Sequence, residues 1–467
     1  MILPPPLKPD RSLQVIRQEL VRQPGLPLAD LLPERQILQA VRDSGASVRE
    51  RVFTPAVTLL TFVCQVLDAD HSCRQAVARL NGWRAAVGLP SVSADNSAYC
   101  KARLRFPEEV LHQLVQGSGA APPAQLAPSW LWKGRHVKVV DGTGLSMPDT
   151  AENQKAYPQP KSIPAGVGFP LMRAVAIFSL ANGAVLDAAM GPFAGKQTGE
   201  LSLFRKIDGV VEAGDVLVAD RLYATFWEVA RLRGRGVDVV MRMHAGRKAV
   251  RFRGRGHSKG NRRVWWRKPQ RPRRMSEEEY ESYPEWIRLR ALRIDVRRRG
   301  CRVRQLVLVT TLVDAKASTM KDIADLYRRR WEVEADLRSL KTTMQMDILR
   351  GKTPEMVRKE VWAHLLAYNL LRTLMAKAAR ATDVPPERLS VAGARQTVSA
   401  FVPHLLAAAT PEQHARLCAA MYEGIATHQV GDRPDRVEPR AVKRRPKNFP
   451  RLKEPRRVAR SRLEKGG

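Results

Sequence analysis

Two short, mainly apolar runs that each lead into an aspartate constrain the fold of this chain more than any other feature. Val137–Val140 precedes Asp141, and Val216–Ala219 precedes Asp220. Runs of this length, rich in β-branched residues, predict buried strands, and the spacing at 225–235 is typical of a helix. Strands followed by helices indicate a mixed α/β core.

The apolar pattern changes from helix-like to strand-like near residue 135. Helix-period spacing occurs upstream at 35–45, 54–68, 72–86 and 107–116, and Asn182-Gly183 downstream is a hairpin signal. We therefore predict a helical N-terminal region (1–130), the first part of an α/β core (131–237), a β-rich basic insertion (238–315), the second part of the core (316–385), a C-terminal helical region (386–431) and an extended basic tail (432–467).

The charge balance indicates the chemistry of a partner. There are 80 Lys and Arg residues against 46 Asp and Glu, which leaves a formal net charge of +34. Such a field favours a polyanion, most simply a nucleic acid, although an anionic membrane surface or ribosomal RNA would also fit. The stretch 247–274 contains no acid and carries Trp265-Trp266. We interpret it as a basic loop in the insertion, with a disordered charged linker as the alternative.

A second basic segment lies in the N-terminal region. Residues 95–105 begin with helix-capping side chains and end in a basic run that includes Arg103 and Arg105. A short helix that faces DNA would have this pattern, and so would an ordinary solvated helix. Arg103 and Arg105 are therefore candidate DNA contacts.

Cysteine usage and hydropathy indicate the compartment. The five cysteines are scattered and never form a C-x-x-C pair, which argues against disulfides and a zinc ribbon and fits a reducing cytosol. The longest apolar run, Val57–Leu67, is far shorter than the roughly 20 residues of a membrane span. The N-terminus lacks the basic start and apolar core of a signal peptide. These features predict a cytoplasmic protein.

The two strand-associated aspartates suit a metal site. A carboxylate on a rigid strand is well placed as a ligand, and each aspartate taken singly also fits a turn residue at a strand end. Mg²⁺ prefers a few carboxylates together with water and phosphate oxygens. Phosphoryl transfer suits two such ions roughly 3.5–4 Å apart. We therefore predict that Asp141 and Asp220 bind two Mg²⁺ ions, for which Mn²⁺ can substitute.

Helix geometry selects one of three acids in segment 322–341. At about 100° per residue, Glu334 lies on one face, whereas Glu332 and Asp336 fall on roughly the opposite side. Without other context the segment also fits a salt-bridged amphipathic helix. Within about 60° of Glu334 lie three groups suited to binding phosphate, namely Tyr327, Arg330 and Lys341.

The spacing Tyr-x₂-Arg-x₃-Glu-x₆-Lys from Tyr327 to Lys341 matches the signature of bacterial insertion-sequence transposases of the insertion sequence four type. Asp141-Gly-Thr and Asp220-Arg-Leu-Tyr resemble the segments around the two catalytic aspartates of that family. The resemblance covers about residues 50–380. It implies a ribonuclease H-like catalytic core with a β-strand insertion between the second aspartate and the glutamate.

The resemblance also implies a reaction and its partners. Hydrolysis frees a 3′-hydroxyl at each element end, this hydroxyl forms a hairpin with the opposite strand, and the reopened end is transferred into target DNA. The partners are double-stranded terminal-repeat and target DNA and a second copy of the chain in a synaptic dimer. The implied catalytic and metal-binding residues are Asp141, Asp220 and Glu334, and the implied DNA contacts are Tyr327, Arg330 and Lys341.

One feature departs from the family pattern. Relatives use a tryptophan in the insertion to trap a flipped base, but the comparable strand here, 304–310, has no aromatic residue. Trp265 or Trp266 is the candidate replacement, and either fits a core position equally well. Two alternatives to a transposase are a metal-dependent nuclease without strand transfer and a DNA-binding repressor or architectural protein. The acid triad argues against the last, because uncompensated carboxylates repel a phosphate backbone.

Overall fold

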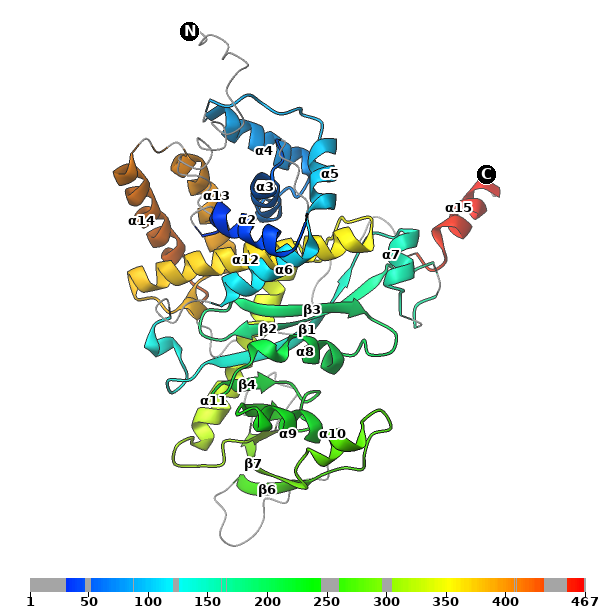
Figure 1. Ribbon diagram of the computed structural model, residues 1–467, viewed down its shortest axis with the longest axis vertical. Coiled ribbons are helices and arrows are strands. Elements are labelled where there is room, and N and C mark those ends of the chain that lie inside the picture. Colours follow the sequence, from blue (N-terminus) through cyan, green and yellow to red (C-terminus); the bar gives the residue numbers. More distant parts are fainter. Residues whose placement is uncertain are drawn as a thin grey trace. The chain divides into compact units, whose positions relative to one another are not determined.

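The chain forms two compact units, which are described separately (Figure 1). The helical unit comprises residues 1–118, 343–345 and 358–430, and the sheet unit comprises residues 119–342, 346–357 and 431–467. The computed structural model describes residues 31–46, 52–86, 88–120, 126–160, 162–164, 166–244, 260–295, 305–406, 408, 410–431 and 452–465.

An eight-stranded sheet organises the sheet unit, in the order β3-β2-β1-β4-β5-β8-β7-β6. β1 pairs in parallel with β4, and β4 with β5, whereas all other neighbours are antiparallel. The hairpin predicted at Asn182-Gly183 joins β2 to β3, and Gly183 has a positive φ of 73°. The strands are β1 (Val137–Ser146), β2 (Leu171–Ser179), β3 (Val185–Pro192), β4 (Val216–Ala219), β5 (Asp238–Arg242), β6 (Asn261–Arg267), β7 (Trp286–Asp295) and β8 (Gln305–Thr310).

The segment predicted as a β-rich insertion, 238–315, contains the strands β5, β6, β7 and β8. β5 is the third parallel strand of the central sheet, and β8 pairs with β5, so β6–β8 extend the same sheet. The sequence of a five-residue strand such as β5 does not indicate which strands it will pair with. Only the observed pairing shows that β5 belongs to the central sheet. Most of the predicted basic loop, 245–259, lies outside the described residues.

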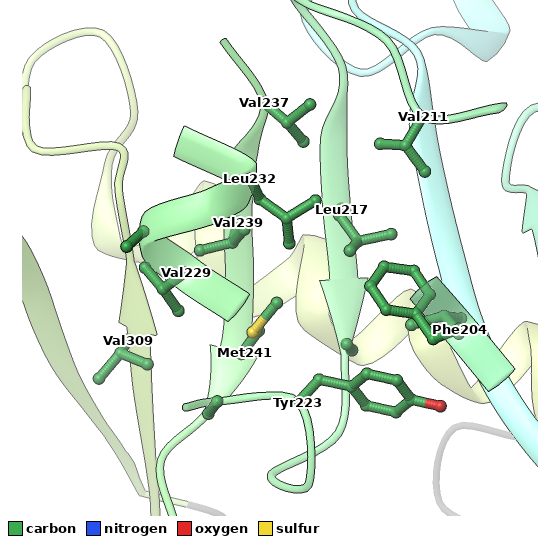
Figure 2. Close-up of a cluster of buried hydrophobic side chains, with 14 of the residues drawn as sticks. Phe204, Val211, Leu217, Tyr223, Val229, Leu232, Val237, Val239, Met241 and Val309 are labelled. Carbon is green, nitrogen blue, oxygen red and sulfur yellow. The ribbon is translucent and has the colours of Figure 1, made fainter. Parts of the chain in front are cut away.

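Helices pack on both faces of the central strands. A buried cluster joins α8 (Glu200–Ile207) and α9 (Phe226–Gly234) to one face, with alternate strand residues such as Leu217 and Val239 pointing into it (Figure 2). α11 (Met320–Arg338) packs on β1, β4 and β5. β4 is buried along its whole length, as expected for a parallel strand that is covered on both sides.

α11 has a well-defined start and an irregular end. Thr319 and Asp322 form a capping box, in which each side chain accepts a hydrogen bond from the other residue's backbone N–H. The regular helix predicted for segment 322–341 does not reach the end of that segment, because the α-helix ends at Arg338 and 339–343 form a π-helical turn. Such turns widen the helix and are frequent at functional sites.

The helical unit combines segments that the sequence analysis placed in three regions. The helices predicted in the N-terminal region are present, and the C-terminal helices belong to the same unit. Its helices are α2 (Glu34–Asp43), α3 (Pro55–Leu67), α4 (Cys73–Ala86), α5 (Ser97–Arg105), α6 (Glu108–Gly119), α13 (Val391–Leu406), α14 (Pro411–Thr427) and most of α12 (Pro354–Thr382).

The basic tail differs from its expected extended form. Residues 456–465 form the exposed helix α15 (Arg456–Lys465), whereas 432–451 lie outside the described residues. Two short helices, α7 (Ala151–Ala156) and α10 (Glu277–Glu281), also belong to the sheet unit. Within the described ranges, every helix is too short or too polar to cross a membrane.

A buried histidine in the helical unit predicts a dependence of stability on pH. His364 on α12 is fully buried, its Nδ1 lies 2.8 Å from the Glu360 carbonyl oxygen, and burial lowers its pKa from 6.5 to about 4. The unfolded chain therefore binds the proton more readily than the folded chain between these two values. The stability contribution is present above pH 6.5 and is lost as the pH falls toward 4.

We expect the free energy of unfolding of the helical unit to fall by about 2 kcal/mol between pH 7 and pH 5 because of this one group. Urea unfolding at constant ionic strength measures it. His364→Phe should flatten the pH dependence, whereas His404→Gln, which alters an exposed histidine on α13, should not. An equal pH dependence in His364→Phe and the wild type would contradict the prediction.

Candidate active site

The two candidate aspartates lie on neighbouring parallel strands. β1 and β4 pair with Val139 opposite Val218, so continuing the register by two residues places Asp141 beside Asp220. Adjacent strands are separated by about 4.8 Å. Asp220 directly follows β4, as predicted. Asp141 is not at a strand end, because β1 continues to Ser146 by pairing with β2 alone. The two carboxylates therefore lie where β4 stops and β1 continues.

α11 brings the third candidate acid to the same place. The Arg330 guanidinium donates a hydrogen bond to Glu334 Oε1 at 2.6 Å, and its Nη1 lies 3.7 Å from Asp141 Oδ2. The Arg330 side chain is only 10% exposed, whereas those of Asp141 and Glu334 are 23% and 31% exposed. One nearly buried cation thus bridges an acid from the sheet and an acid from the helix.

Burial dominates the electrostatics of Asp141. Desolvation raises the pKa of Asp141, and the negative charges of Glu334 and Glu200 add to the rise. A hydrogen bond from the backbone N–H of Gly142 to Asp141 Oδ1, 2.9 Å long, and the Arg330 charge act in the opposite direction. The ionised form of Asp141 is therefore costly in the protein alone and would be favoured by a nearby cation.

The remaining residues of the α11 pattern surround this group. Tyr327 is 6% exposed, and burial raises its pKa to about 12, with the Asp220 charge contributing. Lys341 lies in the π-helical turn rather than on the α-helix, and its Nζ donates to the Gly144 carbonyl oxygen of β1 at 3.3 Å. The structure thus brings Tyr327, Arg330 and Lys341 to the region of the acids. Tyr327 and Arg330 come from the α-helix, whereas Lys341 comes from the π-helical turn that follows it.

The donor set determines which metals the site suits. Within the described part of the chain, no three His, Cys, Asp or Glu side chains already converge in a way that would hold a metal ion. The acids Asp141, Asp220 and Glu334 offer only oxygen donors, which hard divalent cations prefer. Because Glu334 is turned toward Arg330, a cation at these acids would compete with Arg330 for the Glu334 carboxylate. The three carboxylates therefore fit a divalent ion, provided that the ion displaces Arg330 from Glu334.

Two further residues lie at this place, Glu200 and Tyr223, and neither was predicted from the sequence. Glu200, the first residue of α8, reaches Gly142 and acts electrostatically on Asp141. Tyr223 is only 1% exposed, and its buried hydroxyl has no hydrogen-bond partner among the described residues. Tyr223 belongs to the Asp220-Arg-Leu-Tyr motif, which could have signalled its place. No local pattern distinguishes Glu200 from an ordinary acid at a helix start.

The two tryptophans considered for base stacking differ in exposure. Trp266 is 7% exposed and belongs to the core cluster under α9, so it is not available for a base. Trp265, its neighbour on β6, is 60% exposed. The alternation of side chains along a strand explains the difference, and the candidate role is left to Trp265.

The two candidate arginines of α5 also differ. The Arg103 guanidinium lies 4.9 Å from the centre of the Phe62 ring and 5.0 Å from that of Tyr99, and it donates hydrogen bonds to Gln65 and Cys73. Arg103 therefore stabilises the packing of the helical unit. Arg105 is exposed.

Comparisons with known proteins bear on this site. The family described as "Transposase DDE domain" matches residues 132–370, which include all three acids. Transposase InsG for insertion sequence element IS4 of Escherichia coli (strain K12) is 26% identical over 93% of this chain and 96% of its own length. Putative transposase InsL for insertion sequence element IS186A of the same strain is 33% identical over 17% of this chain and 21% of its own length.

A cryo-EM structure of the piggyBac transposase synaptic complex with hairpin DNA covers 86% of this chain and 83% of its own, with a TM-score of 0.42 and 9% identity.

The tryptophan pair yields a stability prediction. Trp266→Ala should lower the free energy of unfolding of the sheet unit by about 3–5 kcal/mol, because it leaves a cavity among packed side chains. Trp265→Ala should change it by less than about 0.5 kcal/mol. Urea unfolding of both variants measures the difference. Equal losses would contradict the prediction, and a larger loss in Trp265→Ala would show that the exposed and buried sides of β6 are assigned the wrong way round.

Proposed function

This chain belongs to the DDE transposase family and is a DNA transposase, and we propose that Asp141, Asp220 and Glu334 are its catalytic acids. The observation that carries the proposal is the bridge that Arg330 forms between Glu334 and Asp141, in register with Asp220 on the next strand. Rigid elements thus bring three acids that are distant in sequence to one region, which supports the catalytic assignment.

We propose a ribonuclease H-like architecture for the catalytic core. The strand order β3-β2-β1-β4-β5, with β1–β3 antiparallel and β4 and β5 parallel to β1, supports it. β6–β8 would then be the insertion between the second aspartate and the glutamate. The helical unit, with exposed Arg105 on α5, is proposed to contain the DNA-binding region.

A DDE domain implies dependence on a divalent metal. We propose that Asp141, Asp220 and Glu334 hold two Mg²⁺ ions, for which Mn²⁺ substitutes. When bound, these ions supply Lewis-acid activation of the attacking and leaving oxygens. Their charge would also offset the cost of ionised Asp141, whose pKa is raised by burial.

The residues beside the acids are proposed to hold DNA. Arg330 lies where its guanidinium can exchange a carboxylate for a phosphate oxygen, a ligand that suits its planar group. The Tyr327 hydroxyl stays protonated at neutral pH, because its pKa is about 12, and so can donate a hydrogen bond to phosphate. Lys341 is held at β1 through Gly144 and adds a point charge for the backbone.

The proposed reaction begins with hydrolysis of one strand at each element end, which leaves a 3′-hydroxyl. That hydroxyl attacks the phosphodiester of the opposite strand and closes a hairpin, water reopens the hairpin, and the 3′-hydroxyl then joins target DNA. Each step exchanges one oxygen for another at phosphorus and needs no redox partner. Two ends must be handled together, so we propose a synaptic homodimer acting on chromosomal DNA in the bacterial cytoplasm.

The alternatives are a nuclease without strand transfer and a repressor or architectural protein on the same fold. The clustered acids support an enzyme over a binding protein, because they repel a phosphate backbone unless a cation intervenes. The net charge of +34 supports DNA as the substrate in every case.

Replacement of the acids tests the proposal. Asp141→Asn, Asp220→Asn and Glu334→Gln should each lower Mg²⁺-dependent cleavage of terminal-repeat DNA by about 10³-fold or more, while leaving DNA binding intact. Glu332→Gln is the matched control, because this acid lies on the same helix but pairs with Arg329. Cleavage and strand transfer are measured on the same DNA. Unchanged cleavage in the three variants would refute the catalytic assignment, and cleavage without joining would favour the nuclease.

The exposed tryptophan yields a separate prediction. If Trp265 stacks on a flipped base, Trp265→Ala should slow hairpin formation by about 5- to 150-fold, since such stacking contributes about 1–3 kcal/mol. Trp265→Phe should retain most of the rate, and first-strand nicking should be unaffected. Trp286→Ala, which removes another exposed tryptophan from the adjacent strand β7, is the control. Normal hairpin formation by Trp265→Ala would rule out this role.

A further inference from the structure

A fourth carboxylate, that of Glu200, lies beside the proposed catalytic acids. A Cβ atom placed on Gly142 would lie 2.9 Å from Glu200 Cδ and 3.1 Å from Oε2, closer than real side chains approach. The Glu200 carboxylate therefore occupies the space that any other residue at position 142 would fill.

The direction of approach follows from the alternation along β1. Val140 points into the core cluster under α8, so Asp141 points to the opposite face and Gly142 again to the α8 face. Glu200 thus reaches the strand from α8, while Arg330 and Glu334 reach Asp141 from α11. Because Gly142 has no side chain, Glu200 on the α8 face can approach Asp141 and Glu334 on the α11 face, with only one strand residue between them.

In the part of the chain that the structure describes, Glu200 has no ion pair that would explain this position. Among the described residues its carboxylate accepts no hydrogen bond from a cation, in contrast to Glu228 on α9, which is paired with Arg205 and Arg231. It is half-buried and interacts with Asp141, an acid of the same charge. Such a placement is unfavourable for the protein alone.

Tyr223 provides an independent observation at the same point. Its buried hydroxyl has no hydrogen-bond partner among the described residues, and burial raises its pKa, with the charges of Glu200, Asp141 and Asp220 adding to the rise. Figure 2 shows its ring at the edge of the core cluster, with the hydroxyl directed away from it. A buried donor without an acceptor, among three carboxylates, indicates that a ligand or water completes the group.

We propose that Glu200 is a fourth carboxylate of the divalent-metal site, and that it reaches the site over Gly142 and receives a hydrogen bond from Tyr223 when a cation is bound. This inference rests on the proposed function, because the cation is the one that Asp141, Asp220 and Glu334 hold. A purely structural role would instead leave Glu200 as an acid that stabilises the start of α8.

The metal alone tests the inference without reference to activity. Mn²⁺ is titrated into DNA-free protein, and the free ion is followed by electron paramagnetic resonance. Glu200→Gln, which preserves shape, should weaken Mn²⁺ binding by about tenfold or more. Glu152→Gln is the control, because Glu152 is an exposed acid in the first turn of α7 and should bind as the wild type does. Circular dichroism checks that each variant is folded.

Gly142→Ala tests the same inference by moving the Glu200 carboxylate instead of replacing it. The added methyl group should push the Glu200 carboxylate away, while the backbone N–H still bonds Asp141. Mn²⁺ binding should weaken in Gly142→Ala, and the same change should have little further effect in a Glu200→Gln background. Independent effects of the two substitutions would show that Gly142 does not act through Glu200.

The acid variants separate failure of this inference from failure of the proposed function. If Asp141→Asn and Glu334→Gln weaken Mn²⁺ binding and Glu200→Gln does not, Glu200 is structural and only this inference is overturned. If none of them changes binding, or the wild type binds no Mn²⁺, the metal site itself is wrongly assigned and both proposals fail.

Discussion

The structure of this transposase depends on how it holds like charges together where β4 ends. The register of β1 and β4 fixes Asp141 and Asp220 side by side, and α11 adds Glu334. Burial raises the pKa of Asp141, and the negative charge of Glu334 adds to the rise. Arg330 offsets part of this repulsion by contacting Glu334 and Asp141 at once, so it organises the site before any cation or phosphate arrives.

The stability that permits such a site comes from elsewhere in the sheet unit. β4 is fully buried between α8 and α9 on one face and α11 on the other, and the cluster around Leu217 and Phe204 contains only apolar side chains and Tyr223. Apolar burial of this kind is non-directional and tolerates the unfavourable electrostatics at the strand end. Apolar packing around β4, rather than the acids, therefore stabilises the elements that hold the site.

The sequence predicted the family of the chain, and several details of the backbone departed from its local patterns. Helix periodicity predicts that Glu334 and Glu332 lie on different faces, and α11 is regular at both positions, with Glu334 bonded to Arg330 and Glu332 paired with Arg329. It misplaced Lys341, because the π-helical turn that carries it depends on packing against β1 and leaves no periodic signal. The extent of β1 beyond Asp141 was also missed, since a strand continues only where a partner is available. Trp265 and Trp266 could be separated only by knowing which side of β6 faces the core.

Gly142 illustrates why such sites depart from local rules. A glycine inside a strand weakens it, and β-propensity alone would favour almost any other residue there. Here the backbone N–H of Gly142 stabilises the charged form of Asp141, and its missing side chain leaves room for Glu200. Both effects concern charge rather than strand stability. The position is best understood as one at which the strand gives up packing so that acids from the two faces of the sheet can approach a common cation.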